Sequence, residues 1–313
     1  MIILFMFLGL LALVLINVPI AVALAVVASA AMVFAHGPDV LPNVALVMMD
    51  GATNFPLIAI PLFILAGSIM NSTGISRRLI AFASAIFGFV KGGLAMVNIG
   101  TSLFFAEISG SAVADVAALG SILIPSMKKK GYPAPFAAAV TSSSATLAVI
   151  IPPSIPMILY AVMAQSSVVQ LFVAGIVPGV LGGFLMMVVA HRFAVHYNYP
   201  VEEVFKVSQV VSTFKDAALA FTLPLIILGG IFGGFVTATE GAGLAVVAAM
   251  VIGAIYHELD WPHLKQAMID GSVQTAVVML LVASSVLIGE YLTEAQVPQT
   301  LADGIGNITQ NKY

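Results

Sequence analysis

The stretch EISGSAVADVAALGS, from Glu107 to Ser121, places two carboxylates and three hydroxyls in the middle of a very apolar chain. Apolar residues make up 61% of the 313 residues, and charged residues only 8%. A water-soluble domain of this size needs more polar surface than that. The sequence therefore predicts an all-α, polytopic membrane protein, in which a polar patch requires a specific reason.

The composition also excludes some classes of binding partner and of catalytic or metal site. The net charge is -3 and the basic residues are scattered through short segments, so no nucleic-acid partner is expected, whereas the apolar segments require a lipid bilayer. The chain has no cysteine, which excludes thiol catalysis and cysteine-ligated metals. The N-terminal run has no basic residues before it and leads into a second apolar segment, which indicates a first membrane helix rather than a cleaved signal.

Proline, glycine, asparagine and the few charged residues mark the ends of the apolar segments. They predict helices near residues 1–17, 20–36, 55–73, 79–91, 92–107, 113–127, 134–163, 168–190, 217–236, 241–256 and 272–292. Lysine and arginine in short loops are biased to the cytoplasm. The residues that this rule places inside are Arg77, Arg78, Lys91, Lys128–Lys130, Arg192, Lys206 and Lys215.

Residues 92–127 have basic residues at both ends and two short apolar arms between them. An ordinary crossing cannot begin and end on one side, so this segment is predicted to be a re-entrant hairpin with its tip at Ser109–Asp115. Backbone at such a tip is tolerated only against protein or a water-filled cavity, so the tip is expected to line a cavity. The alternative is a continuous helix in which Ser-Gly-Ser-Ala forms a small-residue packing seam.

The next segment, residues 134–163, carries Pro152, Pro153 and Pro156 in an otherwise apolar run. Proline lacks a backbone N–H and clashes with the preceding turn, so the prolines predict an unwound break between two half-helices. Secondary transporters use free carbonyls and half-helix ends at mid-membrane to coordinate Na+ and anionic substrates. The alternative is a simple proline kink, with its free carbonyls satisfied by neighbouring Ser and Thr.

Two pairs of segments, each pair separated by about 220 residues, suggest an internal repeat. LAVVASAAMV from Leu24 resembles LAVVAAMVIG from Leu244, and DGATNFPLIAIPLFILAGSI from Asp50 resembles DGSVQTAVVMLLVASSVLIG from Asp270. The basic residues orient the helix at 55–73 from outside to inside. They orient the helix at 217–236 the other way, so the second copy is predicted to be inverted.

This repeat predicts the organisation of the chain. The first repeat covers 1–196, with scaffold helices at 1–91, the hairpin at 92–127, the broken helix at 134–163 and a helix at 168–190. A cytoplasmic linker at 197–215 and a second repeat at 216–313 follow. The same offset sets Tyr313 opposite about residue 92, so the second hairpin would lie beyond this chain. We therefore expect an incomplete form of a longer protein, without transport activity alone.

Several motifs together carry a resemblance to a known family. SGSAVADVAALGS, IPSMKKKGYP, AAAVTSSSATLAVIIPPSIPMILYA and LFVAGIVPG resemble the large membrane subunit of tripartite ATP-independent periplasmic (TRAP) transporters. GGIFGGFVTATEGAGLAVV and QVPQTLA extend the resemblance into the second repeat. It implies an elevator-type, Na+-coupled transporter, multi-pass in the bacterial inner membrane, that imports organic acids such as C4-dicarboxylates or sialic acid. It also implies a small four-helix membrane subunit and a periplasmic substrate-binding protein as partners; no organic cofactor is expected.

In this family one Na+ site lies between the hairpin tip and the unwound stretch of the next helix. The resemblance maps that site, mostly through backbone carbonyls, onto Ser109, Ser111, Ala148, Ile151 and Pro153. The candidate substrate-binding residues are Ser111, Asp115 and Ser143. The chain departs from the family at 148–149, where Ala-Val replaces the usual Gly-Pro, and at 237–240, where Thr-Ala-Thr-Glu replaces Thr-Pro-Thr-Glu.

Asp115 has the clearest reason for its position, because a charged side chain in the membrane costs roughly 2.5–3.5 kcal/mol on insertion scales. It either tunes the ion site or caps the second hairpin arm as an N-terminal carboxylate. Glu107 could instead pair with a lysine of another segment. Ser142, Ser143 and Ser144 either meet polar groups of the substrate or bond back to their own helix.

Three other functions remain open from the residues alone. An intramembrane protease would need a base near Ser109 or Ser111, or a second aspartate near Asp115, and only His36 lies even at the edge of a predicted membrane segment. A channel fits broken helices in an inverted repeat less well than alternating access does. The last alternative is a structural membrane subunit that does not transport.

Overall fold

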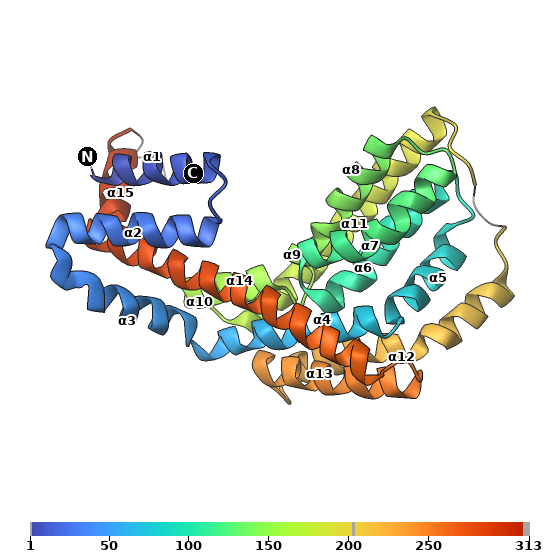
Figure 1. Cartoon of the computed structure of the whole chain (residues 1–313). Helices are drawn as coiled ribbons and strands as arrows, with labels where there is room; N and C mark the ends of the chain where they lie inside the picture. Colours follow the sequence, from blue (N-terminus) through green and yellow to red (C-terminus); the bar gives the residue numbers. More distant parts are fainter. Residues whose placement is uncertain (1, 202–203, 309–313) are drawn as a thin grey trace. The chain divides into compact units, whose positions relative to one another are not determined.

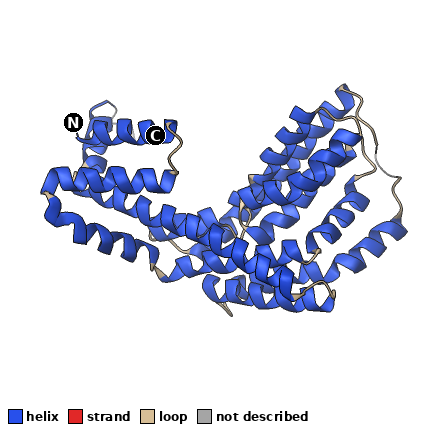
Figure 2. Ribbon diagram, viewed as in Figure 1, coloured by secondary structure: helices blue, strands red, loops and turns tan. Residues whose placement is uncertain are grey.

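The computed structural model describes residues 2–201 and 204–308, except the side chains of 108, 109, 301 and 304–308, and every regular element in this part is a helix (Figure 2). The α-helices are α1 (Ile2–Leu15), α2 (Ile20–His36), α3 (Leu41–Ala52), α4 (Ala59–Ser72), α5 (Ile75–Phe87), α6 (Gly93–Ser109), α7 (Ala112–Lys129), α8 (Ala134–Ala145), α9 (Leu147–Ile150), α10 (Ile155–Met163), α11 (Val168–His196), α12 (Val207–Phe232), α13 (Ala238–Ile255), α14 (Trp261–Glu294) and α15 (Val297–Ile308). Short 3-10 helices cover Pro38–Val40 and Phe55–Ile58. The predicted all-α fold is confirmed.

Several helices are long and apolar enough to cross a membrane. In the described part of the chain these are Phe55–Ser72, α11, α12, α13 and α14. The pair Ala134–Ile150 and Ile155–Met163 passes the same test together and is bent by 42° at its break. The chain is therefore a polytopic membrane protein, as its composition predicted, and the proline-rich segment is a bent helix pair.

The chain folds as two compact units (Figure 1). One contains α1–α3, the C-terminal part of α14 and α15, and the other is Phe55–Val273. In the first unit, Met6, Met32 and Leu287 lie in one buried cluster, and His36 Nε2 lies 3.1 Å from Glu294 Oε1. This division follows packing, whereas the predicted division at 196 and 216 follows sequence similarity, so the inverted repeat stays a prediction.

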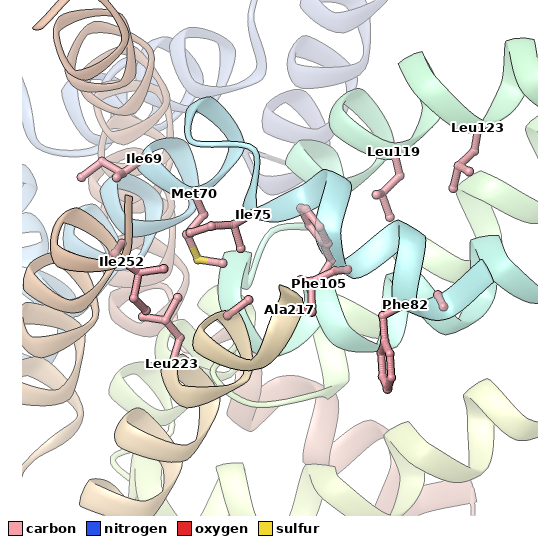
Figure 3. Close-up of a cluster of buried hydrophobic side chains, with 14 of the residues drawn as sticks. Ile69, Met70, Ile75, Phe82, Phe105, Leu119, Leu123, Ala217, Leu223 and Ile252 are labelled. Carbon is pink, nitrogen blue, oxygen red and sulfur yellow. The ribbon is translucent and has the colours of Figure 1, made fainter. Parts of the chain in front are cut away.

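Helix α6 lies at the centre of the second unit and is buried on two faces. On one face, Val97 and Phe105 join a cluster built with α4, α5, α7, α12 and α13 (Figure 3). On the opposite face, Met96 and Ile99 pack in a cluster with residues of α8, α9 and α11. A helix enclosed on both sides is apolar around most of its circumference. The first arm of the predicted hairpin is thus the element around which the second unit is assembled.

The structure adds helices that the sequence did not predict. Helices α3 and α15 lie outside the predicted helical ranges, and α12 begins at Val207, inside the predicted linker 197–215. Pro42 lies at the start of α3, where a proline's missing N–H leaves no helical hydrogen bond unmade. The early start of α12 has a different cause: the apolar side chains of Val207, Val210 and Val211 continue its helical pattern.

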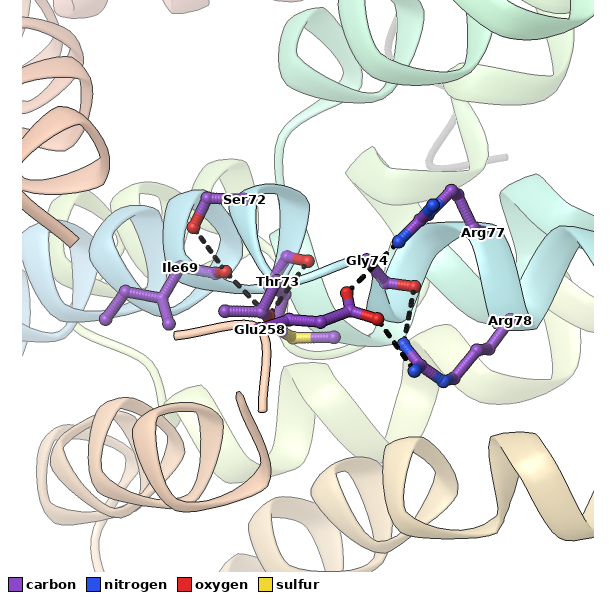
Figure 4. A network of polar contacts seen from close by, with 8 residues as sticks. Ile69, Ser72, Thr73, Gly74, Arg77, Arg78 and Glu258 are labelled. Atoms are coloured by element: carbon purple, nitrogen blue, oxygen red, sulfur yellow. Dashed lines mark hydrogen bonds and ion pairs between the residues drawn. The ribbon is translucent and has the colours of Figure 1, made fainter. Parts of the chain in front are cut away.

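A cluster of charges ties the start of α5 to the loop after α13 (Figure 4). Glu258 accepts hydrogen bonds from Arg78 Nη2 at 2.8 Å and from Arg77 Nη2 at 3.2 Å. Gly74 precedes α5 with a φ of 62°, and a side chain there would collide with the Glu258 carboxylate. The Arg78 guanidinium also lies 3.8 Å from the centre of the Tyr256 ring. These contacts link positions about 180 residues apart in sequence.

This cluster predicts a pH-dependent contribution to stability. The hydrogen bond from Arg78, reinforced by the charges of both arginines, holds the pKa of Glu258 below its ordinary value. A carboxyl with a lowered pKa stabilises the fold above its unfolded pKa, and that contribution is lost as pH falls through the folded value. We expect Glu258→Gln to lower stability at neutral pH by about 1 kcal/mol or less, because the pair is partly solvated.

Thermal unfolding of the detergent-solubilised chain between neutral pH and pH values below the ordinary glutamate pKa checks this expectation. The difference between the wild-type chain and Glu258→Gln should shrink as the pH falls. Asp39→Asn is the matched control, because Asp39 is exposed and lies outside this cluster. A difference that stays constant over the whole pH range would contradict the prediction.

Candidate functional site

The predicted hairpin is formed by α6 and α7, which are joined by two residues. Gly110 takes the left-handed conformation with a φ of 58°, and Ser111 is extended at the N-cap of α7. The Ser111 hydroxyl accepts a hydrogen bond from the Ala114 N–H at 3.3 Å. The two arms have 17 and 18 residues, about 26 Å each, which is just short of a membrane's hydrocarbon thickness of about 30 Å. The tip is therefore a tight turn between two nearly full-length arms.

The hairpin tip lies against the break in the proline-rich segment. The Ile155 N–H donates a hydrogen bond to the Gly110 carbonyl at 3.2 Å. A Cβ added at Gly110 would lie 2.7 Å from the Pro153 carbonyl oxygen, so only glycine permits this approach. Gly110 and Pro153 are both buried. The hairpin tip and the proline break are therefore in direct contact. From the sequence, this contact was suggested only by the closeness of the two segments along the chain.

The break leaves several carbonyls without their helical donors. A helical carbonyl accepts from the N–H four residues later, so Pro152, Pro153 and Pro156 remove this donor from the carbonyls of residues 148, 149 and 152. The Ser154 hydroxyl replaces one of them by donating to the Val149 carbonyl at 2.7 Å. The Ile155 N–H, which would serve Ile151, is bonded to Gly110 instead. The break thus frees backbone oxygens next to the hairpin tip.

A buried polar network joins the first hairpin arm to α8. Asn98 Nδ2 donates to the Thr141 hydroxyl at 2.7 Å, and the Ser102 hydroxyl donates to the Ser144 hydroxyl at 2.9 Å. The Ser144 hydroxyl also lies 3.5 Å from Asn98 Oδ1. All four residues are at most 1% exposed. Because an unpaired polar group is costly in this environment, the network fixes the register of α6 against α8.

Helix α11 supports the break from the other side with a row of small residues. Gly175, Gly179 and Gly183 are buried and follow one another at four-residue spacing. A side chain at Gly175 would meet the Ile150 carbonyl, and one at Gly179 would meet the side chain of Ile151. Such spacing lets membrane helices approach closely. The break is therefore packed between the hairpin and α11.

The residues expected to bind Na+ gather at this contact. Ala148, Ile151 and Pro153 are buried on the side of the break, and Ser111 is at the hairpin tip. The side chain of Ser109 lies outside the described residues. In the described part of the chain, no group of three or more His, Asp or Glu residues could hold a metal ion. A cation here would depend on carbonyl and hydroxyl oxygens, as the sequence suggested, and the assignment stays a prediction.

The structure also places Asp115 and the three consecutive serines at 142–144. Asp115 is 1% exposed in the first turn of α7, whose N-cap is Ser111, so the cap position belongs to the serine. In the serine run, Ser144 faces the hairpin, whereas Ser143 is exposed and lines an apolar groove of about 550 Å3 between α6, α8 and α11. The substrate role of Ser143 stays a prediction. Glu107 is half-buried and forms no ion pair with any described residue.

The sequence reasoning missed Asn98, Ser102 and Thr141. A signal was present, since 98 and 102 are spaced to share one helix face, as are 141 and 144. Burying an asparagine side chain in an apolar membrane segment also costs free energy unless the amide is hydrogen-bonded, so Asn98 indicated a buried partner. Glu240 has a local role, because it completes a capping box with Thr237 at the start of α13.

Comparison with known proteins places this arrangement in a family. Residues 7–313 match the family described as "Tripartite ATP-independent periplasmic transporter, DctM component". The large permease protein DctM of a C4-dicarboxylate TRAP transporter from Pseudomonas aeruginosa is 37% identical over 279 residues, covering 89% of this chain and 65% of that protein. YiaN, the large permease protein of a 2,3-diketo-L-gulonate TRAP transporter from Escherichia coli, is 37% identical over 298 residues, covering 95% and 70%.

A third relative has a different named substrate. SiaM, the large permease protein of a sialic acid TRAP transporter from Vibrio cholerae, is 36% identical over 265 residues, covering 84% of this chain and 62% of that protein. Matches to several relatives cover about 60% of those proteins' length. The family match extends over nearly the whole of this chain, including the hairpin and the broken helix. The chain therefore belongs to the DctM family, the large membrane component of TRAP transporters.

Proposed function

We propose that this chain forms part of the transport core of a Na+-coupled secondary transporter that imports organic acids. Membership of the DctM family makes it a transporter component and not an enzyme. The observation that carries the proposal is the contact between the Gly110 tip and the Pro153 break, which brings freed carbonyls next to a helix N-terminus. Carbonyl oxygens suit a hard monovalent cation, and a helix N-terminus suits an anion.

The site residues have distinct roles in this proposal. Ser109, Ser111 and the carbonyls of Ala148, Ile151 and Pro153 would coordinate Na+. Ser111 and Asp115 would contact the substrate near the tip, with Ser143 as a third contact. Asp115 and an organic anion repel each other, so a bound Na+ between them would lower the electrostatic cost of binding. That dependence of substrate binding on the cation is the physical basis of coupling.

The substrate class and the partners rest on the relatives. Their names cover C4-dicarboxylate, sialic acid and 2,3-diketo-L-gulonate transporters, all of organic acids. By likeness to them, we propose a C4-dicarboxylate or sialic-acid-like substrate. The proposed partners are a small four-helix membrane subunit and a periplasmic substrate-binding protein, and the proposed location is the bacterial inner membrane.

Na+ binding can be measured on the chain itself. In nanodiscs, 100 mM NaCl should raise the unfolding midpoint above that in 100 mM KCl or choline chloride. A dissociation constant of about 10 mM would correspond to about 1.4 kcal/mol of stabilisation. Identical midpoints in the three salts, at equal ionic strength, would contradict Na+ binding by this chain.

Coupling needs the assembled transporter. The full-length large subunit, reconstituted with its two partners in liposomes, should take up labelled organic acid only with an inward Na+ gradient. A panel of succinate, sialic acid and 2,3-diketo-L-gulonate distinguishes the substrate classes. Uptake at the same rate without Na+ would contradict the coupling, even if the chain belongs to the core of the transporter.

A further inference from the structure

The second unit also contains a polar pocket that is separate from the hairpin tip. A pocket of about 570 Å3 is lined by Arg77 and Arg78 of α5, Lys215 and Asp216 of α12, and Tyr256 and Glu258 after α13. The Tyr256 hydroxyl donates to the Asp216 carbonyl at 2.7 Å, which ties the loop to α12. The pocket is therefore a defined junction of three segments, separate from the proposed ion site.

The pocket lies where membrane spans end. The apolar spans of α4 and α13 stop at Ser72 and Ile255, immediately before the pocket residues Gly74 and Tyr256. Lys215 belongs to the first turns of α12, before that helix becomes continuously apolar. An apolar helix ends where the hydrocarbon core meets the headgroups, so the pocket is at headgroup depth. The distribution of Lys and Arg predicts the cytoplasmic side, where anionic lipids attract basic residues.

The charges in the pocket are arranged unequally. Its three cations outnumber its two carboxylates, which leaves a net charge of +1. Arg78 is held in place by Glu258 and by the face of Tyr256. The Arg77 side chain is 71% exposed, and its bond to Glu258 uses one of its several donors. Lys215 is exposed as well. Arg77 and Lys215 are thus the exposed cations of the pocket, and Arg78, whose side chain is 24% exposed, is the more buried one.

Apolar side chains continue from the charged opening along α12. Beyond Asp216 the helix is almost wholly apolar as far as Phe232, and Ile226, about three turns after Lys215 on the same face, is 43% exposed. A ligand with both a phosphate and an acyl chain can use the cations and this apolar surface together, whereas a free phosphate ion can use only the cations.

We propose that this pocket binds the phosphodiester headgroup of an anionic phospholipid such as phosphatidylglycerol. Arg77 and Lys215 bind the phosphate, and the acyl chains lie along the apolar part of α12 that follows Asp216. Arginine suits this role because its planar donors match phosphate oxygens. The Glu258 carboxylate competes with the phosphate for the arginines, because it accepts hydrogen bonds from Arg77 and Arg78 that a phosphate oxygen could accept instead.

The test measures lipid binding to the purified chain by native mass spectrometry and by quenching of a fluorescent lipid in detergent. Phosphatidylglycerol should bind at least tenfold more tightly than phosphatidylcholine with the same acyl chains. The double variant Arg77→Ala/Lys215→Ala should lose that preference. Its matched control is Arg192→Ala/Lys206→Ala, which removes the same charges from exposed positions outside the pocket and should stay within twofold of wild type.

The variant Glu258→Gln should change phosphatidylglycerol affinity in the opposite direction to the double variant Arg77→Ala/Lys215→Ala. Removing the internal carboxylate should tighten phosphatidylglycerol binding by about threefold or more, because Arg77 and Arg78 lose their competitor. A gain of affinity cannot come from misfolding. The proposal is overturned if both double variants weaken binding equally, if phosphatidylcholine binds as tightly, or if millimolar inorganic phosphate displaces the lipid as well as unlabelled phosphatidylglycerol does.

Discussion

Replacing Gly110 by alanine is expected to abolish the Na+-dependent rise in the unfolding midpoint and to reduce uptake by the assembled transporter at least tenfold. An L-residue in the left-handed conformation costs about 1–2 kcal/mol. The larger effect comes from position, because the new methyl group would lie 2.7 Å from the Pro153 carbonyl oxygen. Either the tip or the break must then move, and the oxygens proposed to bind Na+ separate.

Gly131→Ala is the matched control for this prediction. Gly131 also has a positive φ, 90°, but no neighbouring atom of the described residues lies within 4 Å of the position that its Cβ would take. The control therefore carries a similar backbone cost without the collision. It should lower the unfolding midpoint somewhat and keep the full response to Na+. If Gly110→Ala kept a normal Na+ response too, the tip would not form the cation site.

Replacing Asn98 by leucine is expected to destabilise the chain by about 2 kcal/mol. The change removes the hydrogen bond to Thr141 and leaves Thr141 and Ser144 buried without the amide. Removing one partner of a buried hydrogen bond costs about 1–3 kcal/mol, and here the Thr141 hydroxyl loses its donor while it keeps its own bond to the Ala137 carbonyl. The measurement is reversible unfolding of the chain in mixed micelles of increasing denaturing detergent. Ser142→Ala is the control, because Ser142 is exposed and, among the described residues, its hydroxyl bonds to Ala139 of its own helix; it should change stability by less than about 0.5 kcal/mol.

A double variant separates the network from simple loss of packing. In the Asn98→Leu background the Thr141 hydroxyl has already lost its amide donor, so adding Thr141→Val should cost less there than in the wild-type background. A double-mutant cycle should give a coupling of about 1 kcal/mol between the two positions. Strict additivity would mean that the two side chains do not act as a pair, in conflict with their 2.7 Å contact.

Part of the candidate site could be predicted because its causes are local. Pro152, Pro153 and Pro156 remove backbone donors wherever they occur, so the break followed from the residues. Gly110 and Ser111 interrupt an apolar segment with residues that suit a turn and an N-cap, so the tip did too. The family motifs then indicated that the tip and the break belong together, which the Gly110–Ile155 hydrogen bond confirms.

The orientation of each helix could not be predicted in the same way. In a soluble protein the polar face of a helix shows which side is exposed, but here both the protein core and the lipid favour apolar side chains. The sequence therefore did not distinguish Ser143, which is exposed, from Ser144, which is buried against α6. For the same reason Asn98 and Ser102 passed unnoticed, although they anchor the hairpin.

By itself, the sequence determined that this protein is a membrane-embedded helical chain with a turn near Gly110 and a break near Pro153. Composition and backbone chemistry depend on the local sequence alone, so their effects can be predicted without a structure. Only the tertiary structure decided that Asn98 meets Thr141, that Glu258 joins Arg77 and Arg78, and which oxygens of the break lie by the tip. These pairings depend on how helices distant in sequence rotate and pack, and an apolar pattern that suits lipid and core alike does not specify that rotation.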